Sequence, residues 1–437
     1  MDVRRRFLGN KLKTSPNVFN PDNYLTIEAL EDGLYASLSD NDCEYCINDS
    51  NVWITLPAGT NTQTINSGNT LLFRGRLSPT YSIGIGTFTV NKNFNLKGNC
   101  MSMLYYDYAG YASVLNLSYA FRSLFENCTT LKNVYSNFLP ATSITSYVYE
   151  YMFRGCTSLI TPPSLPATTL GSSCYYAMFY NCTSLEEPPS LPATTLAYKC
   201  YNRMFYNCTS LTNAPSLPAT TFALGCYGAM VGGTNLLPDC TNINFSDENT
   251  INSGVCHELF YDTIITDSDL MRLLPTNSSG KYCLPVMNLT IDNVYDGMFY
   301  SCDKLTIAPE LPATTLTNHC YDSMFAYCSS LITAPVLPAT VLAPYCYYSM
   351  FQSCYNLITA PELPAKTLTT NCYYGMFMFC RQLNYIKMLA TDIQASNCLT
   401  DWVYYVSSTG TFEKMTGVNI PTGRDGIPDG WTIVNIS

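Results

Sequence analysis

A short motif recurs along most of this chain, and its spacing constrains the fold more than any other feature. The motif reads C-Y-x-x-M-F-x-x-C-x-S-L-x-x-A-P-x-L-P-A-T-T-L and returns every 26 residues, as the positions of Cys174, Cys200 and Cys226 show. The same spacing marks a second series: Cys320, Cys346, Cys372 and Cys398. A fixed period of about 20–50 residues is typical of a solenoid. Because each unit contacts only its neighbours, one core can extend along the chain without separate globular domains.

Each unit is predicted to contain a short helix followed by a short strand. Cys174, Met178 and Cys182 recur at i, i+4 and i+8, which places them on one face of one or two helical turns. Pro188 and Pro189 forbid a helix in the next segment and limit hydrogen-bonded pairing there. Since every strand enters its unit by the same route, we expect the strands of stacked units to run parallel.

Composition shifts divide the chain into four predicted parts. Residues 1–20 are expected to be a flexible arm, residues 21–101 a small β-sandwich, residues 102–407 the solenoid with irregular units at 231–297, and residues 408–437 a capping hairpin. The sandwich prediction rests on segments rich in β-branched and aromatic residues between turn residues: Tyr24–Ile27, Val52–Leu56, Thr70–Arg74 and Gly86–Val90. Within the irregular units, Asp247-Glu-Asn-Thr and Thr276-Asn-Ser-Ser-Gly are predicted to be inserted loops. Insertions into a solenoid form loops on one face, which is often the binding face.

Composition also excludes several classes of partner. The formal net charge is −10 and only 12% of the residues are charged, so there is no basic stripe for nucleic acid. No apolar run approaches the length of a membrane span, and no secretory signal follows Arg4, Arg5 and Arg6. We expect either a mature protein whose export signal was removed or a protein that leaves its cell inside a virus particle.

The 21 cysteines are predicted to be reduced rather than paired. Within a unit the two cysteines are eight residues apart, as in Cys174 and Cys182. That separation is about 12 Å along a helix, too far for a disulfide. Equivalent cysteines of stacked units would instead form a ladder of small buried side chains. The Cys43-Glu-Tyr-Cys46 pair leaves a zinc site, a redox pair, a local disulfide and unpaired cysteines open.

The repeat core, [AM]-F-x-x-C-x-x-L followed by L-P-A-T-T-L, resembles the leucine-rich repeat of the BspA type over about residues 120–405. The variant is similar to proteins of gut Bacteroidales and their bacteriophages. The flanks Asn23-Tyr-Leu-Thr-Ile and Gly426-Ile-Pro-Asp-Gly-Trp resemble those of the same proteins. The resemblance implies an α/β solenoid, adhesion or host interaction, and no catalysis. The irregular middle departs from the family pattern and argues against a smooth arc.

No residue constellation predicts catalysis, a cofactor or a metal. His257 and His319 are the only histidines, and both are interpreted as surface residues of their units. The segment Gly423-Arg-Asp-Gly-Ile-Pro-Asp-Gly lacks the carboxylate spacing of an EF-hand and is interpreted as tight turns rather than a calcium site.

Two surfaces are predicted to bind a ligand. Tyrosine combines apolar area with a polar tip, which suits sugar or protein surfaces. The recurring tyrosines are Tyr175, Tyr176, Tyr201, Tyr347, Tyr348, Tyr373 and Tyr374. On the strand side, the residues after the recurring leucine differ between units, and the candidates there are Glu186, Thr212, Thr333 and Thr359.

The sequence therefore predicts a non-enzymatic recognition protein. The favoured setting is the surface of a bacteriophage virion, as a tail or head-decorating adhesin that binds a host surface glycan or protein. The alternative is a secreted or surface-anchored bacterial adhesin. Contacts limited to other virion proteins, and self-association, also stay open. A glycan-processing enzyme is a third class, and it would need two convergent carboxylates.

Overall fold

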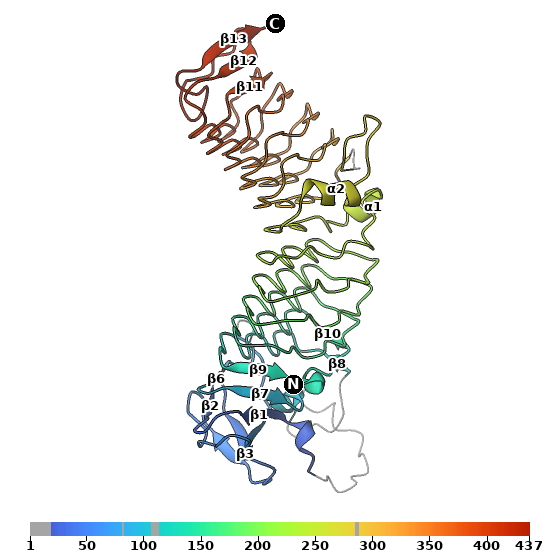
Figure 1. Ribbon diagram of the computed structural model, residues 1–437, viewed down its shortest axis with the longest axis vertical. Helices are drawn as coiled ribbons and strands as arrows, with labels where there is room; N and C mark the ends of the chain where they lie inside the picture. Colours follow the sequence, from blue (N-terminus) through green and yellow to red (C-terminus); the bar gives the residue numbers. More distant parts are fainter. Residues whose placement is uncertain (1–18, 81–82, 106–112, 285–287) are drawn as a thin grey trace, which may run out of the picture.

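The computed structural model describes residues 19–80, 83–105, 113–284 and 288–437. These residues form an elongated stack of coils with strands at each end, and the stack changes direction near α1 (Glu248–Ile251) and α2 (Asp267–Leu273) (Figure 1). The predicted repeat solenoid is confirmed, and it is not a smooth arc. The arm predicted at residues 1–20 falls almost wholly on residues 1–18, outside the described part.

Short strands build the N-terminal end. Their bounds are β1 (Leu25–Ala29), β2 (Ala36–Leu38), β3 (Cys43–Ile47), β4 (Ile54–Leu56), β5 (Thr70–Arg74), β6 (Phe88–Val90), β7 (Phe94–Lys97) and β9 (Leu131–Val134). One sheet has the order β4-β3-β5-β1-β7-β9, and β2 pairs with β6 in a second sheet. The rings of Phe73 and Phe88, 5.0 Å apart, lie in a core shared by both sheets. The description as a sandwich stays a prediction, since the second sheet has only two short strands.

The N-terminal sheet continues into the solenoid. Strand β9 belongs to the first repeat and pairs in parallel with β7, with Phe94 opposite Leu131. Strands β8 (Val114–Leu115) and β10 (Ser143–Ile144) form another parallel pair. Single turns of 3₁₀ helix lie at η2 (Pro21–Asn23), η3 (Cys100–Met103) and η4 (Ser136–Phe138). One connected core of buried side chains runs from the N-terminal strands to the last repeat, so no gap in the core marks the domain boundary predicted at residue 101.

The segment predicted to be a helix in each unit is a run of four-residue turns, so the helix prediction is wrong. Ser173, Ala177 and Asn181 have left-handed backbones, with φ of 52°, 49° and 60°. A left-handed residue at every fourth position is incompatible with a right-handed helix of L-residues. Alternate N–H groups donate to the next coil, as Tyr175 N does to Cys200 O at 3.0 Å. These bonds hold the coils together, whereas a helix would have used them internally.

The four-residue period still places the expected side chains together. Cys174, Met178 and Cys182 are all fully buried, because a spacing of four residues is one turn of this run. All 21 cysteines are free thiols, and all but Cys283 are buried. The Cys182 Sγ donates to the Phe153 carbonyl of the preceding unit at 3.1 Å, and the pattern recurs in later units. The predicted ladder of buried cysteines is confirmed.

Strand alternation decides between the alternatives for Cys43 and Cys46. Both lie on β3, where Cys43 faces the main core and Cys46 faces the other side of the sheet, beside Tyr24 and Leu72. An odd spacing along a strand directs two side chains to opposite faces. The pair can therefore form neither a shared metal site nor a disulfide, and the two cysteines pack separately.

On the strand side the units pair in parallel, as predicted. The contacts are mostly isolated bridges, such as Thr195 with Thr221 and Thr333 with Thr359. The prolines of this segment have no N–H to donate, which limits longer ladders. Continuous parallel pairing appears at the C-terminal end, where β11 (Tyr385–Met388), β12 (Thr411–Met415) and β13 (Thr432–Ile436) form a three-stranded sheet. The predicted capping hairpin is wrong, because β12 and β13 are parallel and continue the solenoid.

The irregular middle contains the two α-helices. The sequence predicts a loop from Asp247 to Thr250, but α1 occupies most of this segment. The second predicted loop is present: Thr276 and Tyr282 pair antiparallel around a tight turn. Neither helix in the described ranges is long and apolar enough to cross a membrane.

Candidate functional site

The first tyrosine of each recurring pair is inside the molecule. Tyr175, Tyr201, Tyr347 and Tyr373 are each 1% exposed. Their rings stack on the equivalent rings of neighbouring units, with Tyr175 and Tyr201 5.8 Å apart and Tyr347 and Tyr373 6.1 Å apart. The prediction that these four residues bind a ligand is wrong, because in this fold they form an internal ladder.

The second tyrosines, Tyr176, Tyr348 and Tyr374, are half-buried on what we call the turn face, the surface of the four-residue turns. The rings of Tyr348 and Tyr374 stack in parallel at 4.7 Å, and Tyr176 meets Tyr151 edge to face at 5.5 Å. Each of these rings thus has a neighbouring ring against it, which reduces the ring surface left for a sugar. These residues offer mainly edges and hydroxyl groups.

The four candidates on the strand side are exposed, and they fall into two groups. We call this surface, formed by the residues after each recurring leucine, the strand face. In the first half, Thr212 Oγ1 donates to Glu187 Oε1 at 2.7 Å and to the Glu186 carbonyl at 3.3 Å, so the surface is polar. In the second half, Thr333 and Thr359 pair as neighbours. Exposed aliphatic side chains surround them: Ile307, Ile332, Val336 and Ile358.

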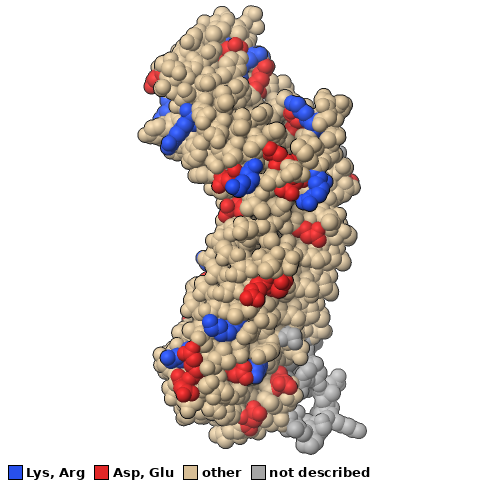
Figure 2. Space-filling view, in the orientation of Figure 1, with Lys and Arg blue, Asp and Glu red and all other residues tan. Residues whose placement is uncertain are grey.

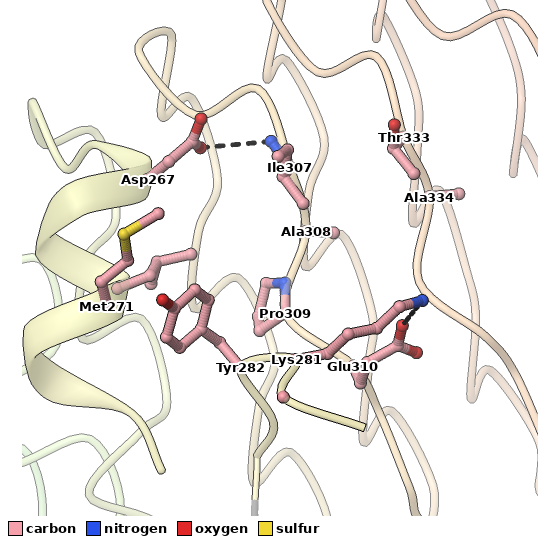
Figure 3. Close-up of a pocket in the computed structure, with 12 residues that line it drawn as sticks. Asp267, Met271, Lys281, Tyr282, Ile307, Ala308, Pro309, Glu310, Thr333 and Ala334 are labelled. Carbon is pink, nitrogen blue, oxygen red and sulfur yellow. Dashed lines mark hydrogen bonds and ion pairs between the residues drawn. The ribbon is translucent and has the colours of Figure 1, made fainter. Parts of the chain in front are cut away.

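A pocket of about 310 Å³ opens on the strand face at the start of the second half. Four chain segments line it: α2, the turn that ends at Tyr282, and the strand segments of two units (Figure 3). The lining residues are Asp267, Leu270, Met271, Gly280, Lys281, Tyr282, Ile307, Ala308, Pro309, Glu310, Thr333 and Ala334. Met271 is 53% exposed and Ile307 is 54% exposed, so both present apolar surface to solvent. Thr333 is the one sequence-predicted residue in this pocket.

Asp267 positions α2 against the strand face. Its Oδ1 accepts hydrogen bonds from the backbone N–H groups of Thr306 at 2.9 Å and Ile307 at 3.2 Å, and its Oδ2 accepts from the Thr306 hydroxyl. Thr266 and Asp269 form a capping box just before and inside the helix. The cap fixes where α2 begins and therefore where Asp267 meets the neighbouring unit.

The rim of the pocket carries one ion pair. Lys281 Nζ lies 2.6 Å from Glu310 Oε1 (Figure 3). Glu310 Oε2 also accepts the backbone N–H of Val336 at 3.1 Å. The charged groups of Asp267, Lys281 and Glu310 thus already have protein partners. What the pocket offers a ligand is mostly carbon surface from Met271, Tyr282 and Ile307.

Sequence reasoning missed Met271, Tyr282 and Ile307. The first two lie in degenerate units, where no repeat position assigns them to a face. Ile307 could have been found, because Ile307, Ile332 and Ile358 are apolar residues within two positions of a recurring buried leucine.

The histidines do not form a catalytic group with this pocket. His257 is 6% exposed, so its interpretation as a surface residue is wrong. Burial lowers the pKa of His257 and raises the pKa of Asp296 to about 8, so their 3.8 Å contact joins two groups that are neutral near pH 7. His319 stacks on Tyr345 at 4.3 Å, and its Nδ1 lies 2.8 Å from Asp322 Oδ2.

Metal-binding groups are also dispersed. In the described ranges, no three His, Cys, Asp or Glu side chains come together as a metal site, and that includes the segment from Gly423 to Gly430. Charged groups are sparse over the face shown in Figure 2, most of which is uncharged. The geometry supports binding of a partner, because the acidic and basic groups at the pocket, Asp267, Lys281 and Glu310, are engaged with protein groups.

The family comparison agrees with this geometry. A model described as the BspA type leucine rich repeat region matches residues 118–221 and 282–399, with six copies. The chain belongs to the BspA-type leucine-rich-repeat family. The match skips residues 222–281, where α1 and α2 interrupt the repeats. The BspA-type repeat is typically a non-enzymatic binding scaffold, and membership points to surface adhesion or recognition.

Other comparisons add little for this BspA-type protein. No curated protein matches it. Among solved structures it is similar to the crystal structure of a TLR13–ssRNA13 complex, with 10% sequence identity and a TM-score of 0.19. The match covers 70% of this chain and 47% of that one, so the chain spans about half the length of that protein. A similarity this low carries no argument about ligands.

Proposed function

We propose that this BspA-type protein is a non-enzymatic recognition protein that binds a partner through the strand face of its second half. The observation that most supports this proposal is the pocket between α2 and Ile307, which lies where the regular repeats are interrupted. Exposed Ile332, Val336 and Ile358 extend the apolar surface away from it. A contiguous exposed apolar patch on a soluble surface is typical of an interaction site.

The partner that fits best is a protein with a bulky apolar side chain. A sugar presents many hydroxyl groups, and each needs a donor or acceptor when it is buried. Here the carboxylate of Asp267 and the Lys281–Glu310 pair are already engaged. An aliphatic or aromatic side chain would cover Met271 and Ile307 without leaving polar groups unpaired. Such an anchor in a desolvated pocket commonly dominates the affinity of an interface.

The setting we propose is the surface of a bacteriophage virion, with the protein acting as a tail or head-decorating adhesin on a host cell. Support comes from the resemblance of the L-P-A-T-T-L repeat to proteins of gut Bacteroidales and their phages. The alternative is a secreted or surface-anchored bacterial adhesin. Mass spectrometry of purified particles and of cell envelopes separates the two, because each predicts the protein in only one fraction.

The binding test uses fluorescently labelled protein on a panel of gut Bacteroidales cells. The wild type is compared with Ile307→Lys and Met271→Lys, which place a charge in the pocket. Ile160→Lys is the matched control, because Ile160 is an exposed isoleucine on the strand face of the first half. Cells are also treated beforehand with protease or with periodate, which removes surface proteins or oxidises surface glycans.

We expect strain-selective binding that protease treatment and both pocket variants reduce at least about tenfold, while Ile160→Lys binds like the wild type. Equal loss in all three variants, or none, would overturn the pocket as the binding site. Binding that periodate removes and protease spares would overturn the protein partner. Thermal unfolding of each variant shows whether the solenoid is intact.

A further inference from the structure

A second site lies at the C-terminal end of the solenoid, apart from the strand-face pocket. It involves the left-handed residue that ends each run of turns. Early units place residues there that tolerate this backbone: Asn127, Gly155, Asn181, Asn207 and Gly233. The last regular units place aromatic residues at the same position, Phe379 and Tyr405, with φ of 64° and 58°. A bulky side chain costs of order 1–3 kcal/mol in this conformation.

Burial of the Tyr405 side chain does not offset this conformational cost. Its side chain is 60% exposed, unlike the fully buried Tyr347 and Tyr373. One face of the ring stacks on Phe379, with 5.4 Å between ring centroids and 12° between planes. The Tyr404 ring lies close to it, with 4.2 Å between ring centroids and a tilt of 52°. Because 60% of its side chain is exposed, Tyr405 presents ring surface to solvent, and the stack on Phe379 fixes the orientation of the ring.

A hollow of about 390 Å³ adjoins this ring. Its walls are the segment from Val403 to Ser408 and the loop that carries Gly423, Arg424, Pro428 and Asp429. Two buried indole groups brace the walls: Trp402 Nε1 donates to the Gly426 carbonyl at 2.8 Å, and Trp431 Nε1 donates to the Ser407 carbonyl at 2.7 Å. The volume falls within the range of small-ligand sites, roughly 300–1,000 Å³.

The polar groups around the hollow converge from both walls. Arg424 directs its Nε toward Asp401 at 3.2 Å and Asp425 at 3.6 Å, and its guanidinium carbon lies 5.8 Å from the centre of the Tyr404 ring. Two exposed side chains also line the hollow: Ser408 from the opposite wall and Asp429 from the same loop as Arg424. The planar guanidinium and the carboxylate of Asp429 can each serve two adjacent hydroxyl groups. One cation among several carboxylates makes the site unsuited to an anion.

From this geometry we infer that the hollow beside Tyr405 binds a neutral pyranose sugar. The sugar's C–H face stacks on the exposed ring surface of Tyr405, while its hydroxyl groups bond to Arg424 and Asp429. This is a second binding activity, in a different class from the protein contact proposed for the strand face. It stands whether or not that contact exists.

The test measures free sugars on the full chain by saturation-transfer NMR and calorimetry, with a panel of neutral hexoses, N-acetylhexosamines and their short oligomers. The decisive variant is Tyr405→Asn, which installs the residue that Asn181 and Asn207 supply at the equivalent position. Asn tolerates the left-handed backbone, so the fold should be at least as stable as the wild type. Tyr327→Asn is the matched control, since Tyr327 occupies the same position in a unit far from the hollow.

We expect at least one sugar of the panel to bind the wild type and to bind Tyr405→Asn and Arg424→Gln about tenfold more weakly or not at all. Tyr327→Asn should bind like the wild type. Failure of the whole panel to bind the wild type, or equal binding by Tyr405→Asn, would overturn the site. Because no cells are involved, this result is independent of the strand-face experiment.

Discussion

The Asp267 carboxylate accepts the backbone N–H of Thr306 at 2.9 Å, in the place that a backbone carbonyl fills between regular units. In the following unit the equivalent N–H, that of Ile332, donates to the Thr306 carbonyl at 2.9 Å. A side chain 39 residues away thus substitutes for the missing coil at the break in the repeats. The Asp267 carboxylate thus gives the first backbone N–H groups of the second half an acceptor, and it holds α2 beside them as one wall of the pocket.

Replacing Asp267 tests this role directly. Asp267→Ala leaves two backbone N–H groups without an acceptor, so we expect the free energy of unfolding to fall by about 1–3 kcal/mol. Asp267→Asn keeps one acceptor oxygen and should lose less. Urea unfolding measures both, with Glu186→Ala as an exposed control expected to stay within roughly 0.5 kcal/mol. An Asp267→Ala protein as stable as the wild type would show that α2 does not support the second half.

The internal tyrosine ladder predicts that removing a buried tyrosine hydroxyl does not destabilise the fold. The Tyr347 hydroxyl is buried and has no hydrogen-bond partner among the described residues. Tyr347→Phe removes an unsatisfied polar group and keeps the ring stacked, so stability should be unchanged or slightly higher. Tyr347→Ala removes the ring and should cost about 3–5 kcal/mol. Thermal unfolding distinguishes the two, and a loss above about 1 kcal/mol in Tyr347→Phe would reveal a partner such as a buried water.

Thiol labelling should find almost nothing in the native protein. Burial raises the pKa of Cys174, Cys354 and their equivalents well above the ordinary range, and only the thiolate reacts. Cys283 is the partly exposed cysteine, so it should account for the fast phase with a disulfide reagent, and Cys283→Ser should remove that phase. Denaturation should then expose all 21 thiols. Several fast-reacting groups in native Cys283→Ser would contradict the ladder.

The buried carboxyl of Asp296 leads us to expect a free energy of unfolding that decreases as pH rises. Burial, with the nearby Asp322 and Glu258 carboxylates, raises its pKa to about 8, against a lowering effect from Lys199. The folded carboxyl keeps its proton where the unfolded one has lost it, so its contribution is complete below its ordinary pKa and is lost as pH approaches 8. His257 has the opposite effect, but only below its ordinary value of 6.5.

The window from pH 6.5 to 8 therefore isolates Asp296 from His257. Denaturant unfolding across that window should show decreasing stability in the wild type and a flatter profile in Asp296→Asn, which stays neutral throughout. Glu186→Gln, at an exposed carboxyl, should follow the wild type. The same slope in Asp296→Asn would assign the pH dependence to another group, of which Asp322 is the first to examine, since burial also raises its pKa.

The sequence predicted part of the candidate site, and the parts it missed have a physical explanation. The strand-face candidates Thr333 and Thr359 are exposed, as the sequence predicts for the variable positions after each recurring leucine. Alternation alone would have turned them inward, because both lie two residues after a buried leucine. Sequence reasoning did not separate the two tyrosines of each Tyr-Tyr pair, because both side chains have the same chemistry. Only the four-residue turn turns Tyr347 inward and leaves Tyr348 at the surface.

The sequence by itself determined the one-dimensional architecture. A strict 26-residue spacing of Cys, Met, Phe and Leu allows only stacked, parallel units with those residues inside, because a single unit cannot bury its own apolar face. Tertiary structure decided the rest. The predicted helix is a run of turns instead, in which alternate backbone N–H groups donate to carbonyls of the next coil. Stacking therefore satisfies backbone groups that a single unit would leave unpaired. Tertiary structure also brought Asp267 to Thr306 and Tyr405 to Arg424, and such meetings depend on where the units end rather than on any local pattern.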